Sequence, residues 1–314
     1  MPSALTHLGS GLAYLVDARA REKSDRETAR QLAWSAGQSS PLPRGLQLTW
    51  LGTAGFRIAY QGTTLWIDPY VTRVALGDVL RRRVVGASGD AIARWIDRAD
   101  AVLVGHTHFD HALDVPAIAR RFGCPVYGST SLAHLMHLHG LAAQATVVEP
   151  RREYEIGPFR VHFVPSVHSK LNLGLAVPYA GELTCDHVDH LTPQAYRCGQ
   201  VWGIHITVAG TRIYHLGSAD LIDDEAAVDR GVDVFLCGIS GRRFSPRYLE
   251  RAIRALDPRF LVPTHYDDFF RPLDAPTRFS FNVNLTSFAD ETRAIARDLP
   301  VHALAIGEPI GESE

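Results

Sequence analysis

The chain has 314 residues, 46% of them hydrophobic, so it can bury a large core, and a disordered or fibrous protein is excluded. Its 32 Lys and Arg are balanced by 34 Asp and Glu, which excludes an overall field that attracts nucleic acid or an anionic membrane. The arginines at 81–83 and 242–243 could form only a local basic patch for a polyanion, and such clusters are usually solvated surface.

The first half of the chain begins with a segment that is predicted to be helical, residues 4–36, followed by a Gly-, Ser- and Pro-containing loop. We therefore divide the chain into an N-terminal helical extension with its linker, 1–45, and one main domain, 46–314. Short strands at 46–52, 55–60 and 63–69, with a Gln-Gly turn at 61–62, predict an antiparallel meander. A helix over 89–99 and a strand over 101–105 follow.

The second half repeats this alternation of strands and helices. Strands are predicted at 160–166, 201–210, 211–217, 232–238, 259–265 and 301–307, with helices at 245–256 and 287–299. Sheets built first from hairpins and later from strand–helix–strand units predict an α/β sandwich with helices on its outer faces.

The cysteines and the N-terminal segment indicate in which cellular compartment the protein is expected. Cys124, Cys185, Cys198 and Cys237 show no C-x-x-C spacing, which argues against a disulfide scaffold or a zinc finger and favours the cytoplasm. No apolar run reaches the roughly 18 residues of a membrane span, and no basic segment precedes the short N-terminal apolar stretch. We expect a mature, soluble protein that acts on a small molecule, without nucleic acid, and a homo-oligomer stays open.

Four potential metal ligands follow the predicted strand 101–105 directly: His106, His108, Asp110 and His111. In an extended segment His106 and His108 point the same way and can share one metal ion. Asp110 and His111 are adjacent and diverge, which suits a second ion beside the first. Nitrogen and oxygen donors of this kind match zinc and other borderline divalent ions rather than calcium.

These four residues cannot fill two metal sites alone, because each zinc ion needs three or four protein ligands. Three later segments each end an apolar strand with a ligand side chain, at His168, Asp220 and His265. Strand ends are where a sandwich can gather residues that are distant in sequence into one rigid site.

Taken together, the segments "WLGTAGFRIAYQGTTLWIDPY", "HTHFDH" and "VPTHYDDF", with His168 and the surroundings of Asp220, resemble the ordered motifs of the metallo-β-lactamase superfamily. Within it they are most similar to the ascorbate-6-phosphate lactonase-like and N-acyl phosphatidylethanolamine phospholipase D-like hydrolases. The resemblance covers roughly residues 46–306. It implies a four-layer αββα sandwich.

The resemblance also implies roles for individual residues. One metal ion would be held by His106, His108 and His168, and the other by Asp110, His111 and His265. Asp68 matches an early aspartate that is expected to hydrogen-bond a ligand histidine and fix its ring. Asp110 and His111 are the implied catalytic residues, with Asp110 also orienting the nucleophile.

The sequence departs from the family pattern at the bridging carboxylate. Family members usually carry Gly-Asp at the end of this strand, whereas here Gly217 is followed by Ser218. Asp220 reaches the metals only if the turn after Gly217 is longer by a bulge. Otherwise the second ion is weakly held, and the enzyme works with one.

The implied cofactor is Zn²⁺, as two ions, with Mn²⁺ or Fe²⁺ as alternatives. Bound zinc lowers the pKa of its water to about 7, which makes hydroxide available at neutral pH. The predicted function is therefore hydrolysis of an ester, lactone or phosphodiester. A phosphodiesterase of lipids or nucleotides, with Arg82 or Arg242 lining the cleft, a mononuclear iron oxygenase and a catalytically silent metal-binding protein stay open as alternatives.

The long stretch 169–200 lies between two ligand segments and is predicted to form a substrate wall. Tyr179, His187 and Tyr196 within it, and Tyr266 beside the last ligand, are the predicted substrate contacts. The His and Asp residues of "CDHVDH" (185–190) and the histidines of "HLMHLH" (134–139) are interpreted as surface or packing groups.

Overall fold

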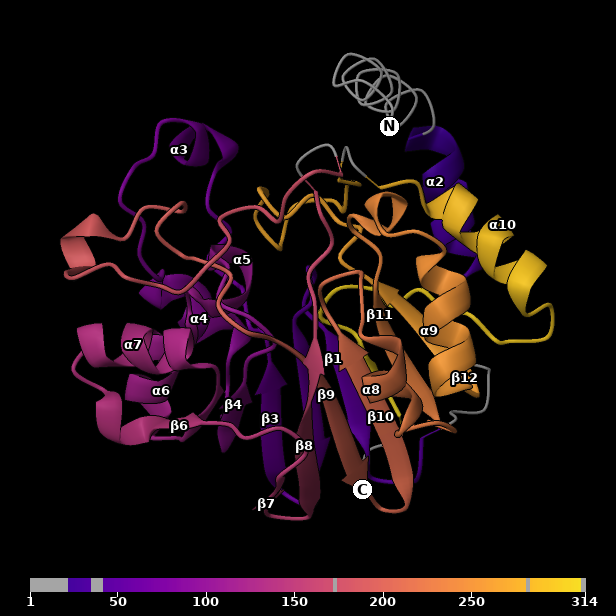
Figure 1. The fold of residues 1–314 in the computed structure, drawn as a ribbon, viewed down its shortest axis with the longest axis horizontal. Helices are drawn as coiled ribbons and strands as arrows, with labels where there is room; N and C mark the ends of the chain where they lie inside the picture. The colour runs from indigo at the N-terminus through magenta and orange to yellow at the C-terminus, as the bar shows by residue number, and fades with distance from the viewer. Residues whose placement is uncertain (1–21, 35–41, 172–173, 281–282, 312–314) are drawn as a thin grey trace.

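The protein folds into two stacked sheets with helices on their outer faces (Figure 1). The structure, a computed structural model, describes residues 22–34, 42–171, 174–280 and 283–311. It confirms the expected α/β sandwich of four layers.

The first sheet has the strand order β13-β1-β2-β3-β4-β5-β6. Its first three strands in sequence form the expected antiparallel meander, and β3 to β6 run parallel. Gln61 and Gly62 turn the chain between β2 and β3 with φ of 45° and 74°, which suits a two-residue hairpin. The strands are β1 (Gln47–Trp50), β2 (Phe56–Tyr60), β3 (Thr63–Ile67), β4 (Ala101–Leu103), β5 (Val126–Gly128), β6 (Ala145–Val147) and β13 (Pro309–Ile310).

The second sheet has the order β12-β11-β10-β9-β8-β7. Strands β7 to β10 pair antiparallel, whereas β10, β11 and β12 pair parallel. As a result β8, β10, β11 and β12 all run in one direction and end at the same edge. The strands are β7 (Glu153–Ile156), β8 (Phe159–Ser166), β9 (Val201–Val208), β10 (Thr211–Leu216), β11 (Val234–Gly238) and β12 (Phe260–Thr264).

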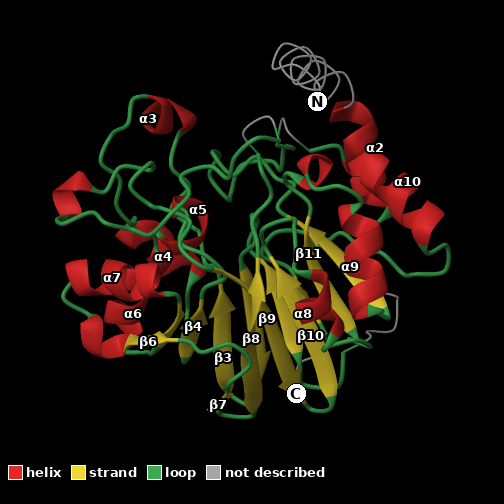
Figure 2. Ribbon diagram, in the orientation of Figure 1, coloured by secondary structure: helices red, strands yellow, loops and turns green. Residues whose placement is uncertain are grey.

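Helices cover both sheets on the outside (Figure 2). α6 shows why they form: Pro116 occupies its first turn, and Gly123, with φ of 66°, ends it in the left-handed conformation that glycine favours. The α-helices are α2 (Glu22–Gln31), α3 (Leu76–Leu80), α4 (Gly89–Trp95), α5 (Phe109–Ala112), α6 (Val115–Phe122), α7 (Thr130–Leu138), α8 (Asp223–Ala227), α9 (Tyr248–Leu256) and α10 (Leu285–Ile295). Single 3₁₀ turns lie at Ala142–Gln144, Val188–His190 and Arg242–Phe244.

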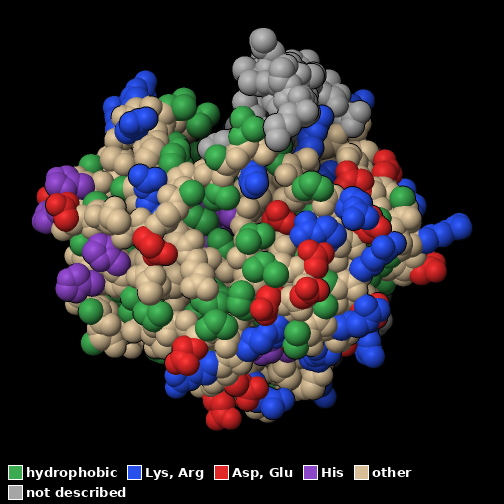
Figure 3. All heavy atoms as spheres, viewed as in Figure 1, with side chains coloured by type: hydrophobic (Ala, Val, Ile, Leu, Met, Phe, Trp, Pro, Cys, Tyr) green, Lys and Arg blue, Asp and Glu red, His purple; other side chains and the backbone are tan. Residues whose placement is uncertain are grey.

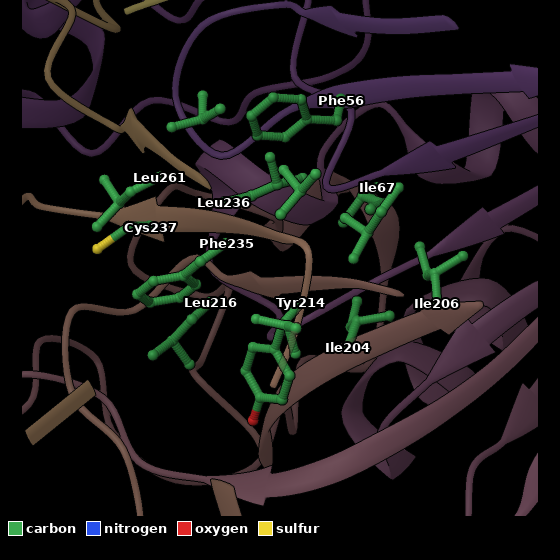
Figure 4. Packing of buried hydrophobic residues seen from close by; sticks show 14 of the residues in the cluster. Phe56, Ile67, Ile204, Ile206, Tyr214, Leu216, Phe235, Leu236, Cys237 and Leu261 are labelled. Atoms are coloured by element: carbon green, nitrogen blue, oxygen red, sulfur yellow. The ribbon is translucent and has the colours of Figure 1, made fainter. Parts of the chain in front are cut away.

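The main core lies between the two sheets. Figure 4 shows Phe56 and Ile67 of the first sheet on the same packed cluster as Ile204 and Leu236 of the second, and all four are fully buried. Each such side chain contributes about 1.5–3 kcal/mol when it leaves water. A second cluster packs the first sheet against its covering helices.

Two sequence predictions differ from the structure. Of the predicted helix 4–36, residues 1–21 and 35–36 lie outside the described residues, and α2 ends at Gln31. Residues 301–307 form isolated bridges rather than the predicted strand, because Val301 pairs with Leu261, Ala303 with Ala33, and Ile306 with Trp50. With three different partners, no continuous ladder can form.

The surface agrees with the balanced composition. On the face that Figure 3 shows, basic and acidic side chains are interspersed. Among the described helices, none combines the length and the apolar character that crossing a membrane requires.

Candidate metal centre

Six histidine and aspartate side chains meet where strands of both sheets end. The three-histidine group consists of His106, His108 and His168, and the aspartate group consists of Asp110, His111 and His265. Within each group one potential ligand atom per side chain lies within 4.8 Å of the others. These residues follow β4, β8 and β12 or lie in α5, so strand direction brings them to one edge.

Hydrogen bonds in the three-histidine group leave one nitrogen of each ring facing its neighbours. His108 Nε2 lies 2.8 Å from the carbonyl of Pro178, and His168 Nδ1 lies 2.7 Å from that of Ser169. A carbonyl only accepts, so these nitrogens carry the protons, and the other nitrogen of each ring has a free lone pair. His108 Nδ1 lies 3.0 Å from His106 Nε2, and the His168 ring centroid is 4.9 Å from that of His106.

The aspartate group is held together by Asp110. Its Oδ2 atom lies 3.3 Å from His265 Nε2 and 3.8 Å from His111 Nε2. The rings of His106 and His111 have centroids only 3.8 Å apart, so the two groups form one centre. Nδ1 of His265 is buried and has no hydrogen-bond partner among the described residues.

Asp68 orients the His111 ring of this centre. It is fully buried at the end of β3, and its Oδ2 atom lies 2.8 Å from His111 Nδ1, so Nε2 of that ring faces Asp110. Its Oδ1 atom accepts a hydrogen bond of 2.7 Å from the Gly105 amide. This is the position that the resemblance implies for Asp68.

Gly217 makes room for the centre at the end of β10. A Cβ atom at this position would lie 3.2 Å from His111 Cε1 and 3.2 Å from Asp68 Oδ2. Such distances are tighter than ordinary contacts, so glycine allows the strand end to approach the His111 ring.

The electrostatics favour the metal-binding form of His108, His168 and Asp110. For His111 burial acts to lower the pKa, but neighbouring carboxylates outweigh it and raise the pKa. Burial, reinforced by neighbouring histidines, lowers the pKa of His168 to about 3, and burial lowers that of His108 to about 4. For Asp110 burial acts to raise the pKa, but His111 and His265 outweigh it and hold the pKa well below its usual value. Neutral imidazoles and an ionised carboxylate are the forms that bind metal, so nitrogen and oxygen donors here fit zinc, manganese or iron.

The structure does not bring Asp220 into either group. Its Oδ1 atom accepts hydrogen bonds of 2.9 Å from Arg251 Nη1 and from the Leu221 amide. Ser218 occupies the strand end instead, and its hydroxyl donates to the Val167 carbonyl at 3.1 Å. The turn after β10 therefore gives the centre no second carboxylate from these positions.

Replacing Asp220 with alanine is expected to leave the number of bound metal ions unchanged, because its carboxylate pairs with Arg251. The free energy of unfolding should fall by no more than about 1 kcal/mol, since the pair is partly exposed. Elemental analysis of the purified variant and urea unfolding check both statements. A lower metal count would identify Asp220 as a ligand.

The predicted substrate residues lie in different surroundings. Tyr179 is half-buried, with its ring centroid 6.3 Å from that of His108, so it borders the three-histidine group. His187 lies on the surface, 3.3 Å from the Asp189 carboxylate. Tyr196 and Tyr266 are buried in the core clusters, and the Tyr266 hydroxyl donates to the Leu304 carbonyl, so neither offers its ring to a substrate.

Sequence reasoning missed the groups that hold the strand ends in place. Arg73 Nη1 lies 2.9 Å from Asp267 Oδ2, and Asp267 Oδ1 accepts from the Thr53 amide at 2.7 Å. The Thr53 carbonyl in turn accepts from the His265 amide at 2.8 Å. The one feature of the sequence that could have indicated this pair is the charged residue Asp267, two positions after a ligand in "THYDD".

Asp114 is a second missed group. Its buried carboxylate accepts hydrogen bonds from the amides of Val71 and Thr72 and from the Thr72 hydroxyl, which holds the segment after Asp68 against α6. Burial raises the pKa of Asp114 to about 6.

Comparisons with known proteins find relatives along most of the chain. A family model described as a β-lactamase superfamily domain matches residues 47–265. The chain is 28% identical over 276 residues to a UPF0173 metal-dependent hydrolase of Anaeromyxobacter dehalogenans (strain 2CP-C), covering 84% of this chain and 86% of that protein. It is also 28% identical over 244 residues to the UPF0173 metal-dependent hydrolase RALTA_A1748 of Cupriavidus taiwanensis, covering 74% and 78%.

Solved structures share the fold at lower identity. Igni18, a metallo hydrolase from the archaeon Ignicoccus hospitalis, superposes with a TM-score of 0.56 at 18% identity, covering 84% of this chain and 97% of that one. An isothiocyanate hydrolase from Delia radicum gut bacteria gives 0.53 at 16% identity, covering 85% and 100%. The diiron β-hydroxylase CmlA of Streptomyces venezuelae gives 0.55 at 15% identity, covering 86% and 54%.

Proposed function

The chain belongs to the metallo-β-lactamase superfamily, and from that premise we propose that it is a metal-dependent hydrolase of an ester, lactone or phosphodiester bond in a small molecule. The observation that carries the proposal is the contact between the three-histidine and aspartate groups, where the ring centroids of His106 and His111 lie 3.8 Å apart. Relatives named metal-dependent hydrolases support it. The lactonase-like or phospholipase-like branch, the cytoplasmic location and a homo-oligomer stay predictions.

The donor sets support two ions, with zinc as the first choice and manganese or iron as alternatives. His106, His108 and His168 would hold one ion through ring nitrogens, and Asp110, His111 and His265 would hold the other. When bound, the ions would supply a hydroxide nucleophile at neutral pH and offset negative charge on the attacked oxygen.

The side chains around the centre have separate tasks in this proposal. Asp110 keeps its charge, because His111 and His265 hold its pKa low although burial opposes this, so it accepts a hydrogen bond and orients water rather than storing a proton. Asp68 fixes the His111 ring through the 2.8 Å contact with Nδ1. Tyr179, at the border of the three-histidine group, is the residue that we propose to contact substrate.

One observation favours the phosphodiester among the candidate substrates. The two groups contain a single carboxylate, Asp110, against five histidines. With two divalent ions bound, this centre would keep a net positive charge, which attracts an anionic substrate. Arg242 adds nothing to it, because its guanidinium donates to the Asn284 carbonyl and pairs with Glu291.

The proposal is tested by elemental analysis together with turnover on chromogenic esters, lactones and phosphodiesters. We expect bound zinc and hydrolysis that His106→Ala abolishes, whereas His137→Ala, which removes an exposed histidine of α7, keeps both. Iron without hydrolysis would point to an oxygenase. Metal without turnover on any of the three substrate classes would support the catalytically silent alternative.

A further inference from the structure

A third cluster of metal-ligating side chains lies away from the centre, on the second sheet. His162 of β8 and His205 of β9 are direct cross-strand partners, and their stacked rings have centroids 4.5 Å apart. Asp229 follows α8 and packs against both strands. One potential ligand atom of each residue lies within 4.8 Å of the other two.

His205 needs a partner that the described residues do not provide. Its side chain is buried, with 4% of the residue exposed, and neither ring nitrogen makes a hydrogen bond within the described part of the chain. A buried polar group without a partner is costly, and native structures seldom contain one. A ligand with affinity for an imidazole lone pair resolves this.

Neighbouring side chains fix the Asp229 carboxylate in place, as is usual for carboxylates that bind metal. Its Oδ1 atom lies 3.0 Å from His162 Nε2, and its Oδ2 atom lies 3.3 Å from Arg151 Nη1. Carboxylates that bind metal are usually fixed in this way by a second hydrogen bond. Arg212 holds the turn by donating to the carbonyls of Asp229, Arg230 and Gly231.

The positive charge of Arg151 is compensated by two carboxylates. The Arg151 guanidinium pairs with the Glu225 carboxylate at 3.1 Å as well as with Asp229. Burial, with a contribution from His162, lowers the pKa of His205 to about 4, so its ring is neutral at neutral pH. Burial acts to raise the pKa of Asp229, but the hydrogen bond from His162 outweighs it and the pKa is lowered.

We propose that His162, His205 and Asp229 form a further binding site for a borderline divalent ion such as Zn²⁺. Two imidazoles and a carboxylate are a donor set that zinc accepts. His162 is partly exposed, so a water molecule can reach the ion as its fourth ligand. The ion takes the place of the proton between His162 Nε2 and Asp229 Oδ1, and the neutral ring keeps that proton at Nδ1 instead. It ties the turn after α8 to β8 and β9, roughly 20 Å of extended chain from His168.

The test counts zinc ions per chain after the full-length protein is loaded with Zn²⁺ and excess metal is removed. We expect His205→Leu and Asp229→Asn each to bind one ion fewer than the wild type and to keep its hydrolytic rate. His302→Leu is the matched control, because His302 also has a buried, unpartnered Nδ1 but belongs to none of the three ligand groups. This control should bind as many ions as the wild type.

The outcomes separate this site from the centre at the strand ends. His106→Ala should lose ions there and still bind the one that His205→Leu loses. Equal zinc content in the wild type and the folded Asp229→Asn variant overturns the proposal, even if His205→Leu does not fold. Absence of hydrolysis in the wild type counts against the proposed function only, because the ion count does not depend on activity.

Discussion

Asp110→Asn is expected to lower kcat/KM for hydrolysis by roughly 10²–10⁴-fold, the range that positioned acid–base groups contribute. Asparagine keeps the shape of the side chain but removes the negative charge beside His111 and His265. It therefore removes the only carboxylate ligand of the aspartate group and replaces a charged acceptor for water with a weaker, neutral one. Metal content should fall together with the rate, as measured by elemental analysis on the assayed sample.

The control is Asp189→Asn, because the Asp189 carboxylate is largely exposed beside His187 and belongs to neither group. It should keep the wild-type rate and metal content. An Asp110→Asn variant with unchanged kcat/KM and unchanged metal content would remove Asp110 from the centre.

Arg73→Met is expected to lower the free energy of unfolding by about 3–5 kcal/mol, because it leaves the Asp267 carboxylate buried and unpaired. The side chains of Arg73 and Asp267 are only 1% and 4% exposed. Arg73 also donates to the Leu51 carbonyl and the Thr53 hydroxyl, so three contacts are lost together. Urea unfolding measures the change, and weaker metal binding should accompany it because Thr53 anchors the His265 amide.

Arg94→Met is the matched control for this experiment. The Arg94–Asp274 pair has an N–O distance of 2.7 Å, but its side chains are 63% and 47% exposed, so its loss should cost at most about 1 kcal/mol. The double variant Arg73→Met/Asp267→Leu removes both charges and should be more stable than the sum of the two single changes predicts. Equal effects of Arg73→Met and Arg94→Met would show that burial does not strengthen the Arg73 contact.

The sequence predicted the parts of the fold and centre that depend on local order. "HTHFDH" directly after an apolar run placed four donors at a strand end, and the structure brings them together with His168 and His265. The family expectation is confirmed by the match over residues 47–265. The meander at the start of the domain followed from alternating apolar residues and one Gln-Gly turn.

The remaining features depend on contacts between distant segments. The Arg73–Asp267 pair joins two loops far apart in sequence, and no local pattern marks it. The burial of Tyr266 was not predictable from its place beside His265, because the φ of 60° at His265 takes the chain out of the extended conformation. The cluster of His162, His205 and Asp229 needs the cross-strand register, which the sequence alone does not give.

The contribution of both sheets to one centre has a consequence for biosynthesis. β12 is the last strand of the second sheet, and His265 follows it directly. During translation, the aspartate group therefore stays incomplete until nearly the whole domain has left the ribosome. In the proposed function, metal loading is then a late step in maturation, and a chain that holds both ions has already brought the ends of β4, β8 and β12 together.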